Sequence, residues 1–328
     1  MKYHLNPVFE TFSLLCFVNS GANFKKEIIK QLDDFGVNGT AFYAVNYPTV
    51  ERYYDLFASQ MIETDGCALI REMCDDIILL LIAILLLHPK WLDDFSSISD
   101  KEVTTVVHNE VACFLESTED LIDALEKSEL SDQGKWQITA LLQQPKKKLA
   151  LVIEAINSNL AAFEYAKKEL ASEITPLLKQ FEGHIEKNEL SPYVRQALAL
   201  NPSAQIIPSL AVTFIILTLN KYCFVGLLLN KISTGQTERL TEVEAALVAK
   251  SLSDASKLDI LHTLKHNELY NLEIAQKLGL TQATISHHMN MLLAAGLVKM
   301  SRKGAKTYYS LCADGIKRYC DWLHEGFL

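Results

Sequence analysis

Apolar positions recur at intervals of three and four residues through most of the front part of the chain. Because that interval places side chains on one face of an α-helix, the pattern predicts successive helices. They are expected over residues 23–35, 49–62, 65–87, 99–116 and 146–184. The last of them contains Pro176, which should kink or split it because proline removes a backbone donor. This long helix suits either a contact within a dimer or the core of one subunit.

Two apolar runs in this front part differ from the rest. Residues 77–87 are uninterrupted but too few to span a bilayer, so they predict a buried helix. Residues 206–229 contain β-branched clusters interrupted by proline and polar residues, which favours a pair of strands over a membrane segment. The polar stretch 232–239 then predicts a boundary. We expect a helical domain with a small β element over residues 1–235 and a second domain over residues 236–328.

Residues 271–294 carry the signals of a helix-turn-helix. Gly279 ends the first helix where a left-handed residue is favoured, and Thr281 caps the second. The second helix has an apolar inner face formed by Ile285, Met289, Leu292 and Leu293. Its outer and lateral positions are short and mostly polar: Gln282, Ala283, Thr284, Ser286, His287 and Asn290. An apolar back with a short polar front suits a helix that enters the major groove of DNA.

After Gly296 the apolar pattern alternates, which predicts two strands over residues 297–302 and 306–311, with a turn at 303–305. Four cations lie on this expected hairpin: Lys299, Arg302, Lys303 and Lys306. A cationic hairpin beside such a helix suits phosphate contact and approach to the minor groove. A charge run alone is usually a solvated face, and a helix pair alone is usually packing. Here cap, breaker, polar helix face and hairpin follow one another in order, which favours DNA binding.

Five segments of this region resemble the ArsR family of winged-helix transcriptional regulators: residues 251–261, 274–280, 281–288, 295–298 and 304–311. The resemblance covers roughly the last quarter of the chain. It implies base or phosphate contact for Gln282, Ser286 and His287. Lys257 stands where the family usually has arginine, so a backbone contact there would lack bidentate geometry. His288 lies at the edge of the apolar face, where packing or hydrogen bonding is as reasonable as DNA contact.

The resemblance also implies positions where a metal ion could bind. The family's soft-metal site places Cys-x-Cys at the start of the first helix of the helix-turn-helix, but Tyr270 and Leu272 occupy those positions here. In the family's other site, on the last helix, the ligand pattern Asp-x-His is broken because Ile316 stands in place of the histidine. Cys320 and His324 share a helix face, but zinc needs more ligands than this pair supplies. We therefore predict no metal site and no cofactor.

Net charge divides unevenly along the chain. The whole chain carries −9, but residues 241–328 contain ten Lys and Arg against nine Asp and Glu. The acidity therefore belongs to the front part. A nearly neutral second domain is compatible with DNA binding but predicts modest non-specific affinity, and an acidic front part disfavours an anionic membrane as a partner.

The seven cysteines are scattered, odd in number and without a Cys-x-x-Cys pair. They predict mostly buried thiols in a reducing cytoplasm. The first residues do not form a signal peptide and lead into an amphipathic helix that contains Glu10. The thirteen glycines include no Gly-x-Gly, and no phosphate loop is present, so no catalytic role is predicted.

We therefore predict a mainly α protein: a large helical N-terminal domain with a small β element, followed by a C-terminal winged helix-turn-helix. It should act in the cytoplasm as a homodimeric transcriptional regulator that binds double-stranded operator DNA. The last helix, residues 315–327, should join the dimer interface. The N-terminal domain should serve dimerisation, response to a small-molecule or protein effector, or both.

Two other functions compete with this prediction. A protein-interaction module that has lost DNA binding is favoured by the lack of Lys and Arg within residues 281–294, and disfavoured by the cationic hairpin. An enzyme with a fused regulatory winged helix is disfavoured by the missing cofactor loops.

Overall fold

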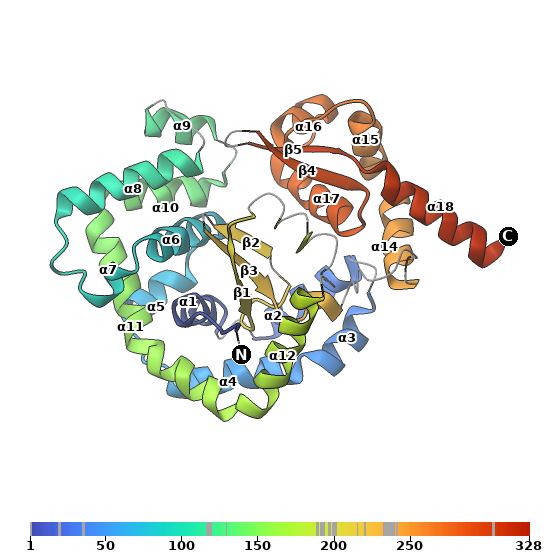
Figure 1. Cartoon of the computed structure of the whole chain (residues 1–328). Helices are drawn as coiled ribbons and strands as arrows, with labels where there is room; N and C mark the ends of the chain where they lie inside the picture. Colours follow the sequence, from blue (N-terminus) through green and yellow to red (C-terminus); the bar gives the residue numbers. More distant parts are fainter. Residues whose placement is uncertain are drawn as a thin grey trace. The chain divides into compact units, whose positions relative to one another are not determined.

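The fold is taken from a computed structural model, in which helices predominate (Figure 1). It describes residues 2–18, 21–34, 37–115, 120–128, 130–187, 190, 194–195, 198, 202–214, 216–219, 221–231, 240, 242–303 and 306–328. For a few residues inside these elements it describes the backbone alone: 21–23, 34, 75, 219, 243, 282–283, 302–303 and 306.

The chain divides into two compact units. The first, here called the helical unit, comprises Leu5–Gly21 and Thr49–Ile174. The second, here called the sheet-and-wing unit, comprises Met1–His4, Ala22–Pro48 and Thr175–Leu328. The predicted domain boundary lies within 232–239, outside the described residues, and remains a prediction.

The helical unit is built around one long central helix. Its elements are α1 (Pro7–Phe17), α4 (Pro48–Gln60), α5 (Asp65–Arg71), α6 (Asp75–Leu87), α7 (Lys90–Asp93), α8 (Asp100–Phe114), α9 (Leu121–Lys127), α10 (Asp132–Gln143) and α11 (Pro145–Glu169). The central helix, α11, packs against α1, α5, α7, α8 and α10. Its helically spaced Val152, Ile156 and Phe163 are fully buried, so removal of apolar surface from water drives this packing.

Gly66 allows α5 to approach α11 closely. A Cβ at this position would lie 1.9 Å from the carbonyl oxygen of Leu151 in α11, so any side chain would push the two helices apart. Asn159 of α11 then holds the segment before α5. Its Oδ1 accepts from the Ile62 N–H at 2.7 Å, and its Nδ2 donates to the Ile62 carbonyl at 3.0 Å.

The prediction of one helix over residues 65–87 is wrong, because the chain leaves the helix between α5 and α6. Side chains of α10 supply the hydrogen bonds that the missing turn would have made. The Gln137 Oε1 accepts from the Cys74 N–H at 3.0 Å, and its Nε2 donates to the Glu72 carbonyl at 2.8 Å. Gln133 donates to the same carbonyl at 3.0 Å. These partners lie some sixty residues further along the chain, beyond the reach of local periodicity.

The predicted helix over residues 146–184 does split, but not at the expected proline. The break falls at Leu170, between α11 and α12 (Ala171–Glu186), where the backbone has φ −100° and ψ 16° and the side chain is fully buried. Pro176 lies inside α12. Proline within a helix removes one hydrogen bond, and here the helix continues past it.

The expectations for the first helix and for the cysteines also need correction. In α1, residues Phe9 to Leu15 are all buried, so the helix is not amphipathic. Glu10 accepts a hydrogen bond from the Tyr53 hydroxyl at 3.0 Å inside the unit. Burial, reinforced by the charge of Glu10, raises the pKa of Tyr53. Fewer cysteines are buried than expected: Cys67, Cys223 and Cys312 are buried, Cys16 and Cys74 are half-buried, and Cys113 and Cys320 are exposed.

The sheet-and-wing unit contains α2 (Gly21–Asp34), α3 (Gly39–Asn46), α12 and a three-stranded sheet of order β1-β3-β2. The strands are β1 (Gln205–Ser209), β2 (Ile216–Leu219) and β3 (Tyr222–Gly226), followed by the 3-10 turn η1 (Leu229–Lys231). The predicted strand pair is confirmed as β2 and β3, which are antiparallel. A third strand, β1, pairs parallel to β3, with Gln205 opposite Tyr222.

A winged helix forms the rest of this unit. It consists of α14 (Glu242–Leu252), α15 (Ala255–Leu264), α16 (Asn271–Leu278), α17 (Gln282–Ala294), β4 (Val298–Lys303), β5 (Lys306–Leu311) and α18 (Ala313–Phe327). One apolar core joins these elements, with Ile260, Ile274, Ile285, Leu292 and Leu297 fully buried in it. The helix-turn-helix and the hairpin are confirmed within one or two residues of their expected ends.

Among the described residues, every helix is too short or too polar to cross a bilayer. The apolar run in α6 belongs to a helix of 13 residues, where a membrane span needs about 20.

Candidate nucleic-acid interface

The turn between α16 and α17 is formed by local signals. Gly279 has φ 65° and ψ 29°, the left-handed conformation that glycine adopts without steric cost. Nothing lies within 4 Å of the position of its missing Cβ, so backbone conformation and not space selects glycine here. Thr281 then caps α17, its side-chain oxygen accepting from the Thr284 N–H at 3.1 Å. These signals end α16 and begin α17 with three residues between them, and the two helices pack against each other.

The inner and outer faces of α17 are those expected. Ile285, Met289, Leu292 and Leu293 are buried. His287 and Asn290 are exposed, and Thr284 and Ser286 are half-buried. The side chains of Gln282 and Ala283 lie outside the described residues, although both backbones belong to the first turn of α17. The described part of the outer face of α17 therefore carries polar side chains of modest size.

Ser286 has a partner that local patterns do not reveal. The Nδ2 of Asn271, the first residue of α16, donates to its hydroxyl oxygen at 3.0 Å. This bond ties the N-terminus of α16 to α17 and orients the serine. The hydroxyl hydrogen of Ser286 stays available for another acceptor, so its contact with DNA remains a prediction.

Lys257 occupies a more enclosed position than a phosphate contact requires. Its side chain is buried, with Nζ 2.9 Å from the Asp254 Oδ2, and its backbone N–H donates to the Asp254 Oδ1 at 3.0 Å. Burial would raise the pKa of Asp254, but the hydrogen bonds and charge of Lys257 outweigh it and lower that pKa. Contact between Lys257 and DNA remains a prediction, and it would require the ammonium group to leave this ion pair.

His288 lies beside the same ion pair. It is half-buried, and burial, together with the charge of Lys257, lowers its pKa, while the charge of Asp254 partly opposes this shift. The imidazole is therefore neutral near pH 7. This placement favours the packing role over DNA contact. The exposed histidine of the pair is His287.

The wing concentrates positive charge at its tip. The strand register sets Lys303 directly opposite Lys306, and Arg302 opposite Thr307. The side chains of Arg302, Lys303 and Lys306 lie outside the described residues, as does the turn at 304–305. Their backbone positions alone gather three cations within two residues of the turn.

Lys299 lies at the base of the wing and is paired. Its Nζ is 3.1 Å from the Asp314 Oδ2 of α18, and this hydrogen bond raises the pKa of Lys299. Both side chains are more than half exposed. Because exposed ion pairs contribute little free energy, Lys299 could exchange Asp314 for a phosphate.

A contact that sequence reasoning missed attaches the wing to the helix-turn-helix. Leu269, just before α16, forms a two-way backbone bridge with Tyr309 of β5, at 3.0 and 2.8 Å. Beside it, the rings of Tyr270 and Tyr308 meet edge to face at 5.6 Å. The Ser301 hydroxyl also donates to the Glu268 carboxylate. A single residue that pairs with a strand produces no periodic pattern in the sequence. The only local signal for this contact is the aromatic pair beside it, Tyr270 and Tyr308.

The last helix exposes apolar side chains towards its C-terminal end, while Ile316 and Tyr319 pack against the core of the winged helix. Phe327 and Leu323 are 72% and 36% exposed, and Tyr319 stacks on Trp322 with ring centroids 6.2 Å apart. The helix packs against α14 and extends to the C-terminus at its far end (Figure 1). Cys320 and His324 are exposed on it. Within the described part of the chain, no three His, Cys, Asp or Glu side chains gather closely enough to hold a metal ion.

Comparison with known proteins places the sequence of this region among DNA-binding regulators. The family model described as "Bacterial regulatory protein, arsR family" matches residues 254–300. The chain is 33% identical to the transcriptional repressor SdpR of Bacillus subtilis over 76 residues, which are 23% of this chain and 84% of that protein. It is 30% identical to the transcriptional activator HlyU of Vibrio cholerae over 82 residues, 25% of this chain and 76% of that protein.

A third relative comes from a resistance operon. The chain is 37% identical to the arsenical resistance operon repressor of Staphylococcus aureus over 68 residues, 21% of this chain and 65% of that protein. No solved structure is significantly similar to the chain. The similarity to these relatives therefore concerns the winged helix, and the helical unit must be interpreted from its own residues.

Proposed function

This chain belongs, through its C-terminal residues, to the arsR family of bacterial regulatory proteins, and from that premise we propose that it binds operator DNA as a homodimer without a metal ion. Residues 254–300 are a DNA-binding transcriptional-regulator domain, which is not enzymatic. In the proposal α17 enters the major groove, where Gln282, Ala283, Thr284, Ser286 and His287 meet base edges or phosphates. The wing contacts the DNA phosphate backbone next to that groove. Its contacting residues are Lys299, Arg302, Lys303 and Lys306.

One arrangement carries the proposal: a polar face on α17 together with a hairpin whose strand register gathers three cations within two residues of its turn. The register pairs the backbone of Lys303 with that of Lys306, and like charges at directly paired positions repel one another. DNA phosphates would remove that repulsion and release counterions. The same cations disfavour a protein-interaction module that has lost DNA binding.

The homodimer follows from the geometry of reading DNA. One recognition helix contacts few base pairs, and a twofold dimer doubles that number on a palindromic site. The exposed Leu323 and Phe327 of α18 offer an apolar surface that a second copy would cover. The helical unit is proposed to add dimer contacts, effector response or both.

Metal independence rests on residue chemistry. Tyr270 and Leu272 stand where two thiolates would be needed for a soft ion, and neither side chain binds one. Cys320 and His324 supply only two ligands, fewer than zinc requires. We therefore propose that any effector acts through the front part of the chain.

Fluorescence anisotropy on cognate and random duplexes tests the proposal, after genome-wide footprinting has identified the operator. Replacing His287, Ser286 or Gln282 with alanine should weaken cognate binding by about 1 to 3 kcal/mol and random-DNA binding by less. The matched control is His266→Ala, which removes an exposed histidine outside the helix-turn-helix. Equal losses on both duplexes would reject base reading. Failure of the wild-type chain to bind any footprinted site would favour the protein-interaction module.

A further inference from the structure

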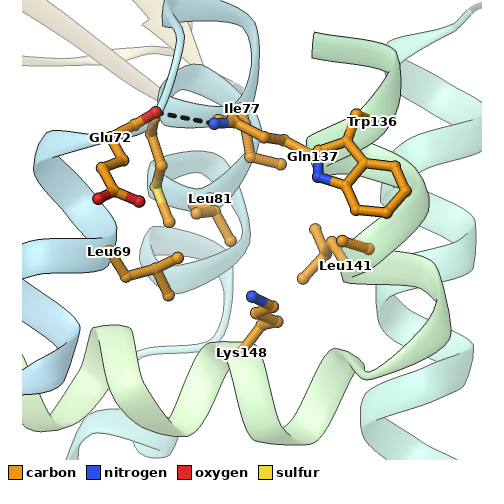
Figure 2. Close-up of a pocket in the computed structure, with 10 residues that line it drawn as sticks. Leu69, Glu72, Ile77, Leu81, Trp136, Gln137, Leu141 and Lys148 are labelled. Atoms are coloured by element: carbon orange, nitrogen blue, oxygen red, sulfur yellow. Dashed lines mark hydrogen bonds between the residues drawn. The ribbon is translucent and has the colours of Figure 1, made fainter. Parts of the chain in front are cut away.

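The helical unit contains a cavity of about 160 Å³ between α5, α6, α10 and α11 (Figure 2). Its walls are mainly aliphatic: Leu69, Met73, Ile77, Leu81, Ala140 and Leu141. Glu72, Trp136, Gln137 and Lys148 bring polar or aromatic groups to it. An apolar hollow with a few convergent polar groups is the usual form of a small-molecule site.

One wall of this cavity is held by the hydrogen bonds that end α5. Both polar atoms of the Gln137 carboxamide are engaged, one with the Cys74 N–H and the other with the Glu72 carbonyl. Gln137 is therefore committed to the protein and is not the group that recognises a ligand. Its bonds keep the wall in place whether or not the cavity is occupied.

Lys148 is the polar group that the fold leaves unused. Among the residues that the structure describes, neither its ammonium group nor the Glu72 carboxylate has an ion pair or hydrogen bond. By contrast Lys146, two residues earlier, lies 2.8 Å from Asp100. Figure 2 shows the amino end of Lys148 directed into the space between Leu69 and Leu141, and the Glu72 carboxylate at the edge.

The two unpaired charges differ in their exposure. Lys148 is half-buried, and Glu72 is exposed. A cation among apolar groups gains more from an opposite charge than a well-hydrated carboxylate does, because the local dielectric is lower. The cavity therefore favours an anionic ligand, bound by Lys148 with its apolar body against the aliphatic walls.

The size of the cavity and the position of Trp136 limit the class of ligand further. An apolar cavity of about 150 Å³ holds one benzene molecule, so this cavity holds a single ring. Trp136 is 70% exposed although its ring borders the cavity, and a flat ligand would cover part of the indole.

We propose that this cavity binds a small aromatic monocarboxylate, with the carboxylate on Lys148 and the ring between Trp136 and the aliphatic walls. Binding itself is independent of the DNA-binding proposal. Its regulatory consequence, a change in operator affinity, rests on the proposed function.

Calorimetry and tryptophan fluorescence on the full chain, with benzoate as the probe, test the site. Benzoate should bind saturably, one molecule per chain, and change the emission of Trp136. Lys148→Ala should weaken binding about tenfold or more, the loss expected for a hydrogen bond to a charged group. The matched control is Lys147→Ala, an exposed neighbour that does not line the cavity. Benzylamine, of similar shape but opposite charge, should bind about tenfold more weakly than benzoate.

Three outcomes would overturn the site: no saturable binding of benzoate, equal losses in the Lys147 and Lys148 variants, or tighter binding of benzylamine.

A second variant, Ala140→Phe, fills the cavity and should abolish benzoate binding while the circular dichroism spectrum stays unchanged. If that variant does not fold, the Lys148 series decides alone. Benzoate binding by a chain that binds no DNA would support the site and reject the proposed function. Operator binding without benzoate binding would reject the site alone.

Discussion

The winged helix and the helical unit differ in where their polar side chains point. In the winged helix, His287 and Asn290 face outward and the cations gather at the hairpin tip. In the helical unit, Glu10, Gln137 and Asn159 turn inward and hold the fold together. A surface that contacts a partner must present residues at fixed local spacing, whereas internal hydrogen bonds join positions far apart in the chain. The comparison explains why one region resembles known regulators and the other must be understood from its packing.

The largest expected effect tests how tightly the helical unit is packed. Gly66→Ala should lower the free energy of unfolding by about 3 kcal/mol, because the new Cβ would overlap the Leu151 carbonyl of α11. Urea unfolding followed by circular dichroism measures this loss. Gly183→Ala is the control, since nothing lies within 4 Å of that position in α12, and it should be neutral or slightly stabilising. Gly279→Ala, limited only by its positive φ, should cost about 1 kcal/mol. Equal effects at all three glycines would contradict the close contact between α5 and α11.

The second test asks whether the apolar face of α18 belongs to a dimer. Replacing Leu323 and Phe327 with glutamate should raise the dissociation constant of the dimer at least about tenfold, because burying one such side chain is worth about 1.5 to 3 kcal/mol. Sedimentation velocity at several concentrations measures it. Glu325→Gln, on the same exposed helix, is the control. An unchanged dimer would shift dimerisation to the helical unit.

The third test separates the wing from the recognition helix. Alanine at Arg302, Lys303 and Lys306 should weaken binding to every duplex alike and flatten the salt dependence by roughly 0.9 per lost phosphate contact. Alanine at Lys265, Lys277 and Lys317 removes the same charge from exposed positions elsewhere in the domain and serves as the control. If both triple variants had the same salt slope as the wild type, the wing would have no role in DNA contact.

The smallest expected effect is on the pH dependence of the free energy of unfolding. Burial and Lys257 lower the pKa of folded His288, so the unfolded chain takes up its proton first. The stabilisation is complete above about pH 6.5, the ordinary value for histidine, and is lost as the pH falls from there towards the lowered pKa. Partial exposure keeps this contribution to the free energy of unfolding small. The groups that face this imidazole are Asp254, Lys257 and His287. His288→Gln should flatten the pH dependence of unfolding, and His266→Gln, at an exposed histidine that does not face His288, should leave it unchanged.

Local signals account for what could be predicted. Gly279 and Thr281 each act on residues within one helical turn, and the strand alternation after Gly296 is equally local, so the winged helix follows from the sequence. The break before α6 depends on glutamines some sixty residues away, and the burial of Glu10 depends on Tyr53. The bond from Asn271 to Ser286 likewise joins two helices. Such partners become visible only when the chain is folded.

The bridge between Leu269 and Tyr309 has a consequence for how operators of this protein can diverge. It fastens the hairpin to the helix-turn-helix through two backbone hydrogen bonds, which no substitution other than one to proline removes directly. On the proposed function, the distance between the groove that α17 would enter and the phosphates that the wing would reach is then fixed by the backbone. Base preference within a half-site would change through single substitutions on α17, whereas the spacing between half-sites would change only through the proposed contact between two copies of the chain.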